Sequence, residues 1–194
     1  MKKEIKQPRN RRIVELGPDT LSDKSCALSD KLDMKRAVTI KRSISIRASA
    51  EHCFEFISKQ LEEKPDWDPI LTWVNPITLK YTRVGSMSRV NFSLDGLREE
   101  AVAMIRFFRP NRSLLWTSNN SNQLQEHWEL QPEPYGTLVN VTLGYNTGGW
   151  IFGWLADRIH LRSKVEKAVT EMLEKLKIAA ESKQQNFKAV TQES

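Results

Sequence analysis

The last third of the chain constrains the fold most. A strand-like segment ends in a Gly-rich, aromatic stretch at residues 148–153, and one long amphipathic helix follows it to about Glu181. A helix of roughly thirty residues is about 45 Å long. No other segment predicts a helix of comparable length, so we expect its apolar stripe to pack against a sheet. A long helix lying across a curved antiparallel sheet favours an enclosed space, and hence a container for an apolar small molecule.

Size and composition favour one globular domain. The 194 residues leave room for one sizeable domain and little for a second. The hydrophobic content of 39% supports a packed core, and no apolar run approaches the length of about eighteen residues that a membrane span needs. The charged N-terminus has no secretory pattern, and Cys26 and Cys53 show no redox or metal spacing. We therefore expect reduced thiols and a cytoplasmic protein.

The net charge of +6 belongs mainly to the beginning of the chain. Residues 1–37 hold ten Lys or Arg against six Asp or Glu, whereas the remainder holds twenty against eighteen. We interpret residues 1–37 as a disordered basic leader, because they are polar and lack sustained periodicity. The leader is either a solvated tail or a segment that touches anionic membrane, ribosome or nucleic acid. The nearly neutral remainder argues against a nucleic-acid partner elsewhere.

The order of elements is readable from periodicity and turn signals. A period-2 strand begins near Val38, and two short helical segments follow, one capped by Ser49 and one ending before Pro65. Six strand candidates come next, at 71–80, 86–94, 99–108, 113–118, 123–131 and 137–145. Short links between them predict an antiparallel meander. We expect the domain to span 38–183 and residues 184–194 to form a disordered tail.

Several short motifs stand in a recognisable order within this pattern. They are the strand-to-helix step at 46–57, the Trp67-Asp68-Pro69 turn, the Val84-Gly85-Ser86 turn, the stretch at 108–112, and the Trp128-Glu129-Leu130 strand before Gly136-Thr137. With them, residues 44–181 resemble the START-like superfamily, which includes polyketide cyclase/dehydrase-like and lipid-transfer proteins. The resemblance implies an α+β helix-grip fold, in which a curved seven-stranded antiparallel sheet, two short helices and one long C-terminal helix enclose a cavity. It implies no single chemistry, because the superfamily mixes binders, transporters, enzymes and ribosome-associated proteins.

The long helix places two arginines on its expected apolar stripe. At 100° per residue, Arg158 and Arg162 fall near the middle of the stripe that also holds Leu155. A buried guanidinium needs a partner. One option is ion pairing, for which the acidic candidates are Glu166, Glu126, Asp66 and Asp68. The other is a cationic spot that holds a carboxylate, phosphate or enolate oxygen of a ligand.

Large aromatic side chains are candidates for the wall of a cavity. Alternation groups several rings on one face of the sheet, and two tryptophans bracket the entry to the second strand. The rings are Trp67, Trp73, Phe92, Trp116, Trp128 and Tyr145. Each ring alone fits ordinary core packing, but together they indicate a pocket with flat apolar walls and a few polar tips. With Leu155, Arg158 and Arg162, these rings make up the predicted ligand-binding set.

The segment at 148–153 does not fit a phosphate-binding loop. Its spacing is not G-x-G-x-x-G, and no Gly-Lys-Ser/Thr follows. We interpret it as a hinge whose apolar tips gate the cavity or touch a membrane interface, with simple packing at the helix start as the alternative. The predicted gate residues are Trp150, Phe152 and Trp154.

Familiar catalytic and metal-binding sets are missing from the sequence. His52, His127 and His160 lack metal-ligand spacing, and no nucleophile set is evident, so we expect no metal and no cofactor. If Trp128 points inward, Glu126 does too. Glu126 is therefore the one catalytic candidate, as a buried acid or base, unless it pairs with Arg162.

The leading hypothesis is a non-enzymatic binder or carrier of an apolar or amphipathic small molecule, such as a lipid, isoprenoid or polyketide. One alternative is an enzyme of the aromatase/cyclase/dehydratase type acting on a polyketide-like substrate, in which positioning and polarisation supply the rate. Another is an interaction protein that uses its basic leader on ribosome, nucleic acid or membrane. The expected partner is an apolar small molecule, and peripheral membrane contact stays open.

Overall fold

The computed structural model describes residues 37–63, 65–78, 82–94, 97–119, 123–146 and 158–192. Side chains are described in these ranges except at positions 37, 94, 97, 146, 158–160 and 183–192. Residues 1–36 of the leader lie outside the described residues, as do Leu155 and the predicted gate residues Trp150, Phe152 and Trp154. Among the helices of the described ranges, none has both the length and the apolar character of a membrane span.

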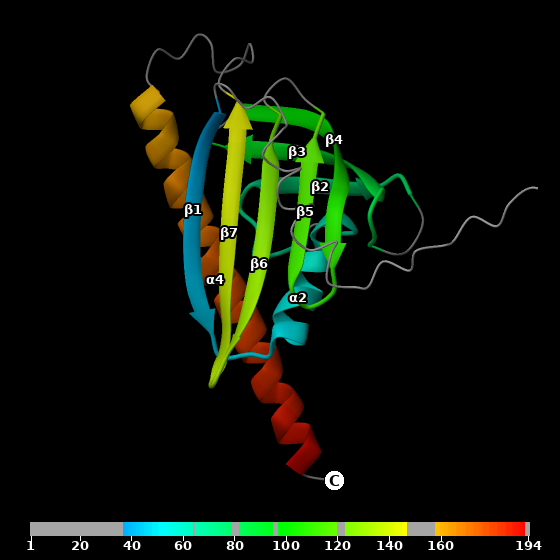
Figure 1. Cartoon of the computed structure of the whole chain (residues 1–194), viewed down its shortest axis with the longest axis vertical. Coiled ribbons are helices and arrows are strands. Elements are labelled where there is room, and N and C mark those ends of the chain that lie inside the picture. The colour runs from blue at the N-terminus through cyan, green and yellow to red at the C-terminus, as the bar shows by residue number, and fades with distance from the viewer. Residues whose placement is uncertain are drawn as a thin grey trace, which may run out of the picture. The chain divides into compact units, whose positions relative to one another are not determined.

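Seven strands form one antiparallel sheet, as the sequence predicts (Figure 1). They are β1 (Ala37–Ile46), β2 (Leu71–Pro76), β3 (Met87–Leu94), β4 (Leu97–Arg109), β5 (Ser113–Ser118), β6 (Gln125–Glu133) and β7 (Gly136–Asn146). Their order in space is β1-β7-β6-β5-β4-β3-β2. The strands from β2 to β7 are therefore a meander, and β1 joins it by pairing with β7, which leaves β1 and β2 at the two edges.

In the described part of the chain, three helical segments accompany the sheet: α2 (Ala50–Ser58), the short 3-10 helix η1 (Lys59–Leu61) and α4 (Arg158–Gln192). Ser49 caps α2 as predicted, since its Oγ accepts a hydrogen bond from the backbone N–H of His52 at 3.2 Å. The predicted end of α4 near Glu181 is wrong. Residues 184–192, expected to be a disordered tail, continue the helix, because no Pro or Gly interrupts it there.

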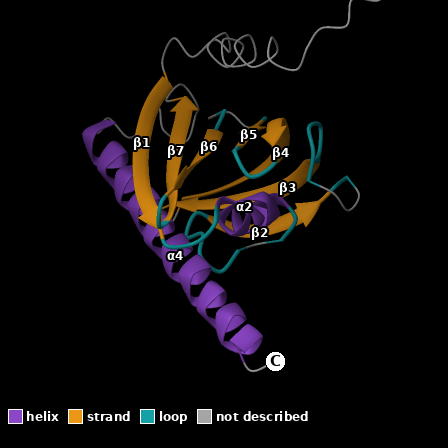
Figure 2. Cartoon of the chain, turned by 60° about the horizontal axis from the view of Figure 1, so that its bottom comes forward, coloured by secondary structure: helices purple, strands orange, loops and turns teal. Residues whose placement is uncertain are grey.

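The helices cover one face of the curved sheet (Figures 1 and 2). The first turns of α4 run along the edge strand β1, and later turns pass α2. The core lies between α4, α2 and the concave face of the sheet. Helix α2 contributes Cys53, Phe54 and Ile57 to this core. The buried stripe of α4 contributes Val165, Val169, Met172, Leu173, Leu176 and Ala180.

One row of inward side chains crosses the sheet in register. Ile40 on β1 faces Leu143 on β7, and Leu143 faces Glu126 on β6. Glu126 in turn faces Trp116 on β5, and Trp116 faces Ile105 on β4. All of these side chains are buried. A carboxyl group therefore lies inside an otherwise apolar layer.

Candidate ligand-binding site

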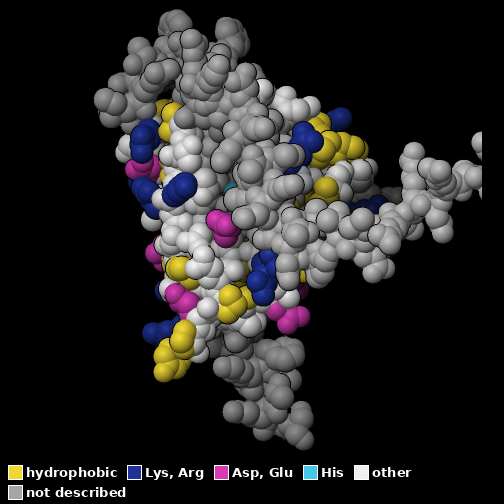
Figure 3. All heavy atoms as spheres, viewed as in Figure 1, with side chains coloured by type: hydrophobic (Ala, Val, Ile, Leu, Met, Phe, Trp, Pro, Cys, Tyr) yellow, Lys and Arg dark blue, Asp and Glu magenta, His cyan; other side chains and the backbone are white. Residues whose placement is uncertain are grey.

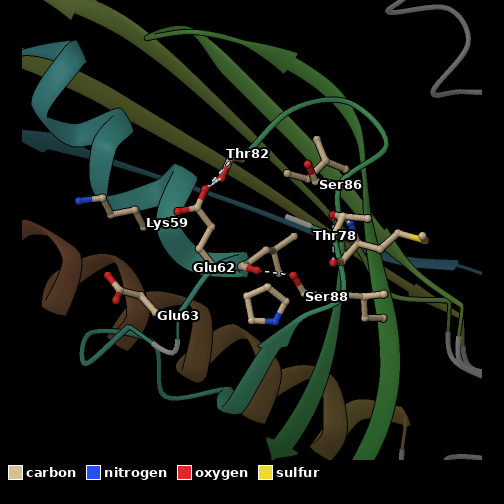
Figure 4. Close-up of a pocket in the computed structure, with 12 residues that line it drawn as sticks. Lys59, Glu62, Glu63, Thr78, Thr82, Ser86 and Ser88 are labelled. Atoms are coloured by element: carbon tan, nitrogen blue, oxygen red, sulfur yellow. Dashed lines mark hydrogen bonds between the residues drawn. The ribbon is translucent and has the colours of Figure 1, made fainter. Parts of the chain in front are cut away.

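A pocket of about 560 Å³ opens between η1 and the segment that joins β2 to β3 (Figure 4). Its apolar lining consists of Leu61, Pro76, Ile77, Met87 and Ile105. Its polar lining consists of Lys59, Glu62, Glu63, Thr78, Thr82, Ser86 and Ser88. The volume falls in the range of roughly 300–1,000 Å³ that is usual for small-molecule sites. We call this the η1 pocket.

Hydrogen bonds from Thr82 and Ser88 tie the walls of the η1 pocket together. The backbone N–H of Thr82 donates to Glu62 Oε1 at 2.9 Å. On the other side of the pocket, Ser88 Oγ donates to the carbonyl oxygen of Leu61. Figure 4 shows both contacts reaching from the strand side to the helical side. The geometry of this pocket therefore depends on where η1 lies.

The charges around the η1 pocket disfavour an anionic ligand. Lys59 Nζ lies 2.9 Å from Glu55 Oε1, and this hydrogen bond raises the pKa of Lys59. Glu62 and Glu63 add carboxylates to the lining. A polar group bound here meets an ammonium that is already paired and two carboxylates, so a neutral or cationic group is favoured.

A second pocket, of about 350 Å³, lies between η1, α2 and α4. It is lined by Glu55, Phe56, Lys59, Glu63, Pro65, Asp66, Trp67 and Ala179. Lys59 and Glu63 line both pockets. The η1 segment is therefore a wall of each, and a movement of η1 changes both volumes.

Most of the predicted aromatic set lies together on the concave side. Trp67 packs edge-on against Trp128 with ring centroids 6.1 Å apart, and Phe92 stacks on Trp116 at 6.0 Å. Tyr145 is buried on β7, and this burial raises its pKa. Ile105 of the η1 pocket faces Trp116 across β4 and β5. Trp116 therefore lies next to a residue that lines the pocket.

The space expected beneath the long helix is filled where these rings lie. Trp116, Trp128, Val139 and Met172 each have 0% exposed surface, so no water-sized gap adjoins them. Two open volumes lined by described side chains, of about 560 and 350 Å³, lie beside η1.

Trp73 does not join the aromatic layer, contrary to the prediction. Leu71 pairs with Phe92 but Trp73 pairs with Asn91, so two residues of β2 span one residue of β3. This β-bulge turns Trp73 away from the concave face, and its side chain is 43% exposed. Val74 takes the inward position beside Val90.

Arg162 is also misplaced by the sequence pattern. Its side chain is 58% exposed, and its Nε donates to Glu166 Oε1 at 2.9 Å. Arg42 of β1 donates to the other oxygen of Glu166 at 3.0 Å. At this end α4 runs along the edge strand β1, and Arg162 and Arg42 meet at Glu166. The ion pair with Glu166 is one of the options weighed above, whereas the side chain of Arg158 lies outside the described residues.

Glu126 points inward with Trp128, as alternation along β6 predicts. Trp116 Nε1 donates to Glu126 Oε1 at 3.1 Å, and Trp128 Nε1 donates to the same oxygen. The Glu126 side chain is 2% exposed. Burial, with the negative charge of Asp68, raises the pKa of Glu126 to about 8. Its hydrogen-bond partners among the described residues are therefore the two indoles and Gln60 rather than Arg162.

Gln60 and Asp68 are buried near Glu126, and the three residues form one buried polar cluster. The sequence pattern assigned neither Gln60 nor Asp68 to such a cluster. Asp68 Oδ1 accepts hydrogen bonds from the backbone N–H groups of Ile70 at 2.7 Å and Leu71 at 3.1 Å. Gln60 Nε2 donates to Asp68 Oδ2 at 2.9 Å. The turn signal Asp68-Pro69 could have indicated the backbone contacts. Nothing in the sequence marks Gln60, because its burial comes from tertiary packing.

No protein-family model matches the chain, and no curated protein matches it. The solved structure of TTHA0849 from Thermus thermophilus matches with a TM-score of 0.62 at 20% identity, over 74% of this chain and 97% of that chain. The Zhui aromatase/cyclase from Streptomyces sp. R1128 matches with a TM-score of 0.62 at 14% identity, over 75% and 94%. A START superfamily protein from Mycobacterium smegmatis matches with a TM-score of 0.55 at 18% identity, over 77% and 98%.

The chain has the START-like, helix-grip fold. Within this fold the candidate site has two layers. The outer layer is the η1 pocket, which is large enough for a small molecule. The inner layer is closed and consists of aromatic rings around one buried carboxyl group. Among the described residues, no group of three or more His, Cys, Asp or Glu side chains is placed to hold a metal ion.

Proposed function

We propose that this START-like domain binds an apolar or amphipathic small molecule in the η1 pocket. The observation that carries the proposal is the volume of about 560 Å³ together with an apolar lining that is continuous with the core. Leu61 and Ile105 belong to both the lining and the buried core cluster. A bound molecule would therefore extend the core outward and remove apolar surface from water.

The lining also indicates the chemistry of the ligand. Its apolar body would contact Leu61, Met87 and Ile105, and a polar end would meet the hydroxyl groups of Thr78 and Ser86. A lipid, an isoprenoid or a polyketide-like molecule with a neutral or cationic end fits this arrangement. The earlier expectation of an anionic end held by Arg158 and Arg162 is not part of the proposal, because Arg162 lies in an exposed ion pair.

Binding is favoured over turnover. The shared fold with the Zhui aromatase/cyclase keeps a reaction of that kind among the alternatives. A substrate would have to reach the Glu126 carboxyl group to use it as an acid or base. Glu126 is nearly inaccessible to solvent and does not line the η1 pocket. In the row of side chains across the sheet, Trp116 separates Glu126 from Ile105, which is the residue of this row that lines the pocket.

A fluorescence titration with N-phenyl-1-naphthylamine tests the proposal. This probe is apolar and uncharged at neutral pH, and we expect saturable binding with a dissociation constant on the order of 100 μM. Ile77→Asp places a carboxylate on the apolar lining at a side chain that is 50% exposed, so the fold should tolerate it. We expect at least fivefold weaker binding, because a charge in an apolar wall is costly to desolvate.

Ile178→Asp is the matched control, because Ile178 is also exposed but lies on α4 and outside both pockets. Its affinity for the probe should equal that of the unmodified chain. The anionic analogue 8-anilino-1-naphthalenesulfonate should bind more weakly than N-phenyl-1-naphthylamine. Equal losses in the two variants, or fluorescence that never saturates, would remove the η1 pocket as the binding site.

A further inference from the structure

The smaller pocket, of about 350 Å³, has walls of its own as well as walls that it shares with the η1 pocket. Phe56 of α2, Asp66 and Trp67 of the turn before β2, and Ala179 of α4 line the smaller pocket and not the η1 pocket. Its volume lies at the lower end of the usual range for small-molecule sites. We call this the α2 pocket.

Two aromatic rings in the wall of the α2 pocket are held in place by packing. Phe56 contacts the ring of His52 edge-on, with centroids 5.2 Å apart. Trp67 is 5% exposed and packs edge-on against Trp128. Because neighbouring rings already fix both side chains, a ligand that packs on them loses little free energy in ordering them. Faces of aromatic rings also attract cations.

Among the described residues of the lining, carboxylates outnumber ammonium groups. Glu55, Glu63 and Asp66 are acidic, and Lys59 is basic. The Lys59 ammonium is already paired, because its Nζ lies 2.9 Å from Glu55 Oε1. An entering cation therefore meets two further carboxylates, those of Glu63 and Asp66, whereas an entering anion meets a net negative charge.

We propose that the α2 pocket binds a primary ammonium ion carried on a small apolar body. The ammonium would donate to the carboxylates of Glu63 and Asp66, and the apolar body would pack on Phe56 and Trp67. A primary ammonium suits this lining, because it has three N–H donors for carboxylate oxygens and a charge that aromatic rings attract. The site does not depend on the function proposed above.

The cavity, the rings and the carboxylates select this ligand only in combination. An apolar cavity without carboxylates would bind a neutral ring as well as a cationic one. Carboxylates on an open surface would hold a cation only weakly, because water and salt screen exposed charges. In the α2 pocket the acidic side chains stand at the rim of a volume that also offers two rings.

A titration with benzylammonium tests the site, with benzyl alcohol and benzoate as neutral and anionic probes of nearly the same size. The ¹H–¹⁵N signals of the full chain would be followed at about pH 7 and constant ionic strength. We expect saturable shifts at the Trp67 indole N–H and at the backbone N–H groups of Phe56 and Asp66. The dissociation constant of benzylammonium should be on the order of 1 mM. Benzyl alcohol should bind at least fivefold more weakly, and benzoate should leave these signals unmoved.

Three variants locate the ammonium and the ring of the probe. Asp66→Asn removes an exposed carboxylate and should weaken benzylammonium at least threefold without changing the affinity for benzyl alcohol. Phe56→Leu keeps an apolar side chain and removes the ring, so both probes should bind more weakly. Glu51→Gln is the matched control for Asp66→Asn, because Glu51 is an exposed carboxylate of α2 outside both pockets. Its affinities should equal those of the unmodified chain.

Equal affinities for benzylammonium and benzyl alcohol would overturn the preference for a cation, and so would equal losses in Asp66→Asn and Glu51→Gln. Shifts that gather at Met87 and Ser88 of the η1 pocket, or that never saturate, would reject the α2 pocket as the site. If a variant fails to fold, the three probes decide the preference on the unmodified chain. None of these outcomes depends on N-phenyl-1-naphthylamine, so the proposed function stands or fails separately.

Discussion

A carboxyl group in an apolar layer is tolerated only when its hydrogen bonds are complete. Glu126 stands in one row with Ile105, Trp116 and Leu143, and indoles are its hydrogen-bond donors in that layer. When the Glu126 carboxyl group is neutral, burying it carries no penalty for removing a charge from water. The two indoles and Gln60 are then its hydrogen-bond partners. At the residue scale, the chemistry of Glu126 is set by its neighbours and not by the residue type.

The pH dependence of stability follows from this single group. The folded pKa of about 8 lies above the ordinary 4.5, so the folded protein holds the Glu126 proton more tightly than the unfolded chain does. The resulting stabilisation is complete below pH 4.5 and is lost as pH rises to about 8. The expected slope is about 1.4 kcal/mol per pH unit within that window.

Glu126→Gln should remove this slope, because the amide keeps the hydrogen bonds and does not titrate. Urea unfolding at about pH 6, 7.5 and 9 should show the free energy of unfolding of the variant rising relative to that of the unmodified chain. Glu129→Gln serves as the comparison at an exposed site. Parallel pH curves for Glu126→Gln and the unmodified chain would show that Glu126 is ionised in the folded state.

At the scale of elements, sequence periodicity predicted correctly which side chains point toward the core, wherever the strand or helix has no bulge or other irregularity. Alternation along β6 placed Glu126 and Trp128 inward, and both are buried. The same rule failed for Trp73, because the bulge in β2 adds a residue that no sequence signal marks. Helical periodicity likewise placed Arg162 on the same stripe of α4 as the buried residues. It did not predict where α4 lies relative to the edge of the sheet, and therefore not that Arg162 is exposed. Both failures come from backbone geometry and packing that one sequence does not specify.

The η1 pocket lay beyond sequence reasoning for a similar reason. Its walls come from η1, from the segment between β2 and β3, and from Ile105 on β4. None of these segments carries a binding motif. The pocket exists because Glu62 and Leu61 are held to Thr82 and Ser88, and these contacts form only in the folded chain.

The junction of β1 and β7 gives a test of the strand pairing. A Cβ added at Gly136 would lie 2.1 Å from the carbonyl oxygen of Ile46, and this backbone atom is fixed by the pairing of β1 with β7. Gly136→Ala should therefore lower the free energy of unfolding by about 3 kcal/mol in urea denaturation.

Gly85→Ala is the matched control for Gly136→Ala. Its added Cβ meets nothing within 4 Å, so its cost comes only from the backbone φ of +86°. We expect a loss of about 1 kcal/mol for this strain. A Gly136→Ala protein no less stable than Gly85→Ala would contradict the close approach of β7 to β1.

At the scale of the whole molecule, the fold is the helix-grip fold and the described charges are mixed in sign. On the face seen in Figure 3, the described Lys and Arg side chains lie among Asp and Glu side chains and do not gather into one basic patch. The START-like architecture was predictable, because element order and motif order are properties of the sequence. Of the candidate site, only the layer of buried aromatic side chains was predictable, because the alternation of residues along the strands shows which rings point inward.

The claim that the η1 pocket binds an apolar molecule is tested most directly by mapping a ligand onto the folded chain. Backbone ¹H–¹⁵N signals of the full protein would be followed while N-phenyl-1-naphthylamine is added at about pH 6.5. The account predicts saturable shifts concentrated at Leu61, Thr82, Met87, Ser88 and Ile105, with α4 signals such as Ile178 unmoved. Shifts that gather elsewhere, or none at probe concentrations that saturate fluorescence, would contradict it.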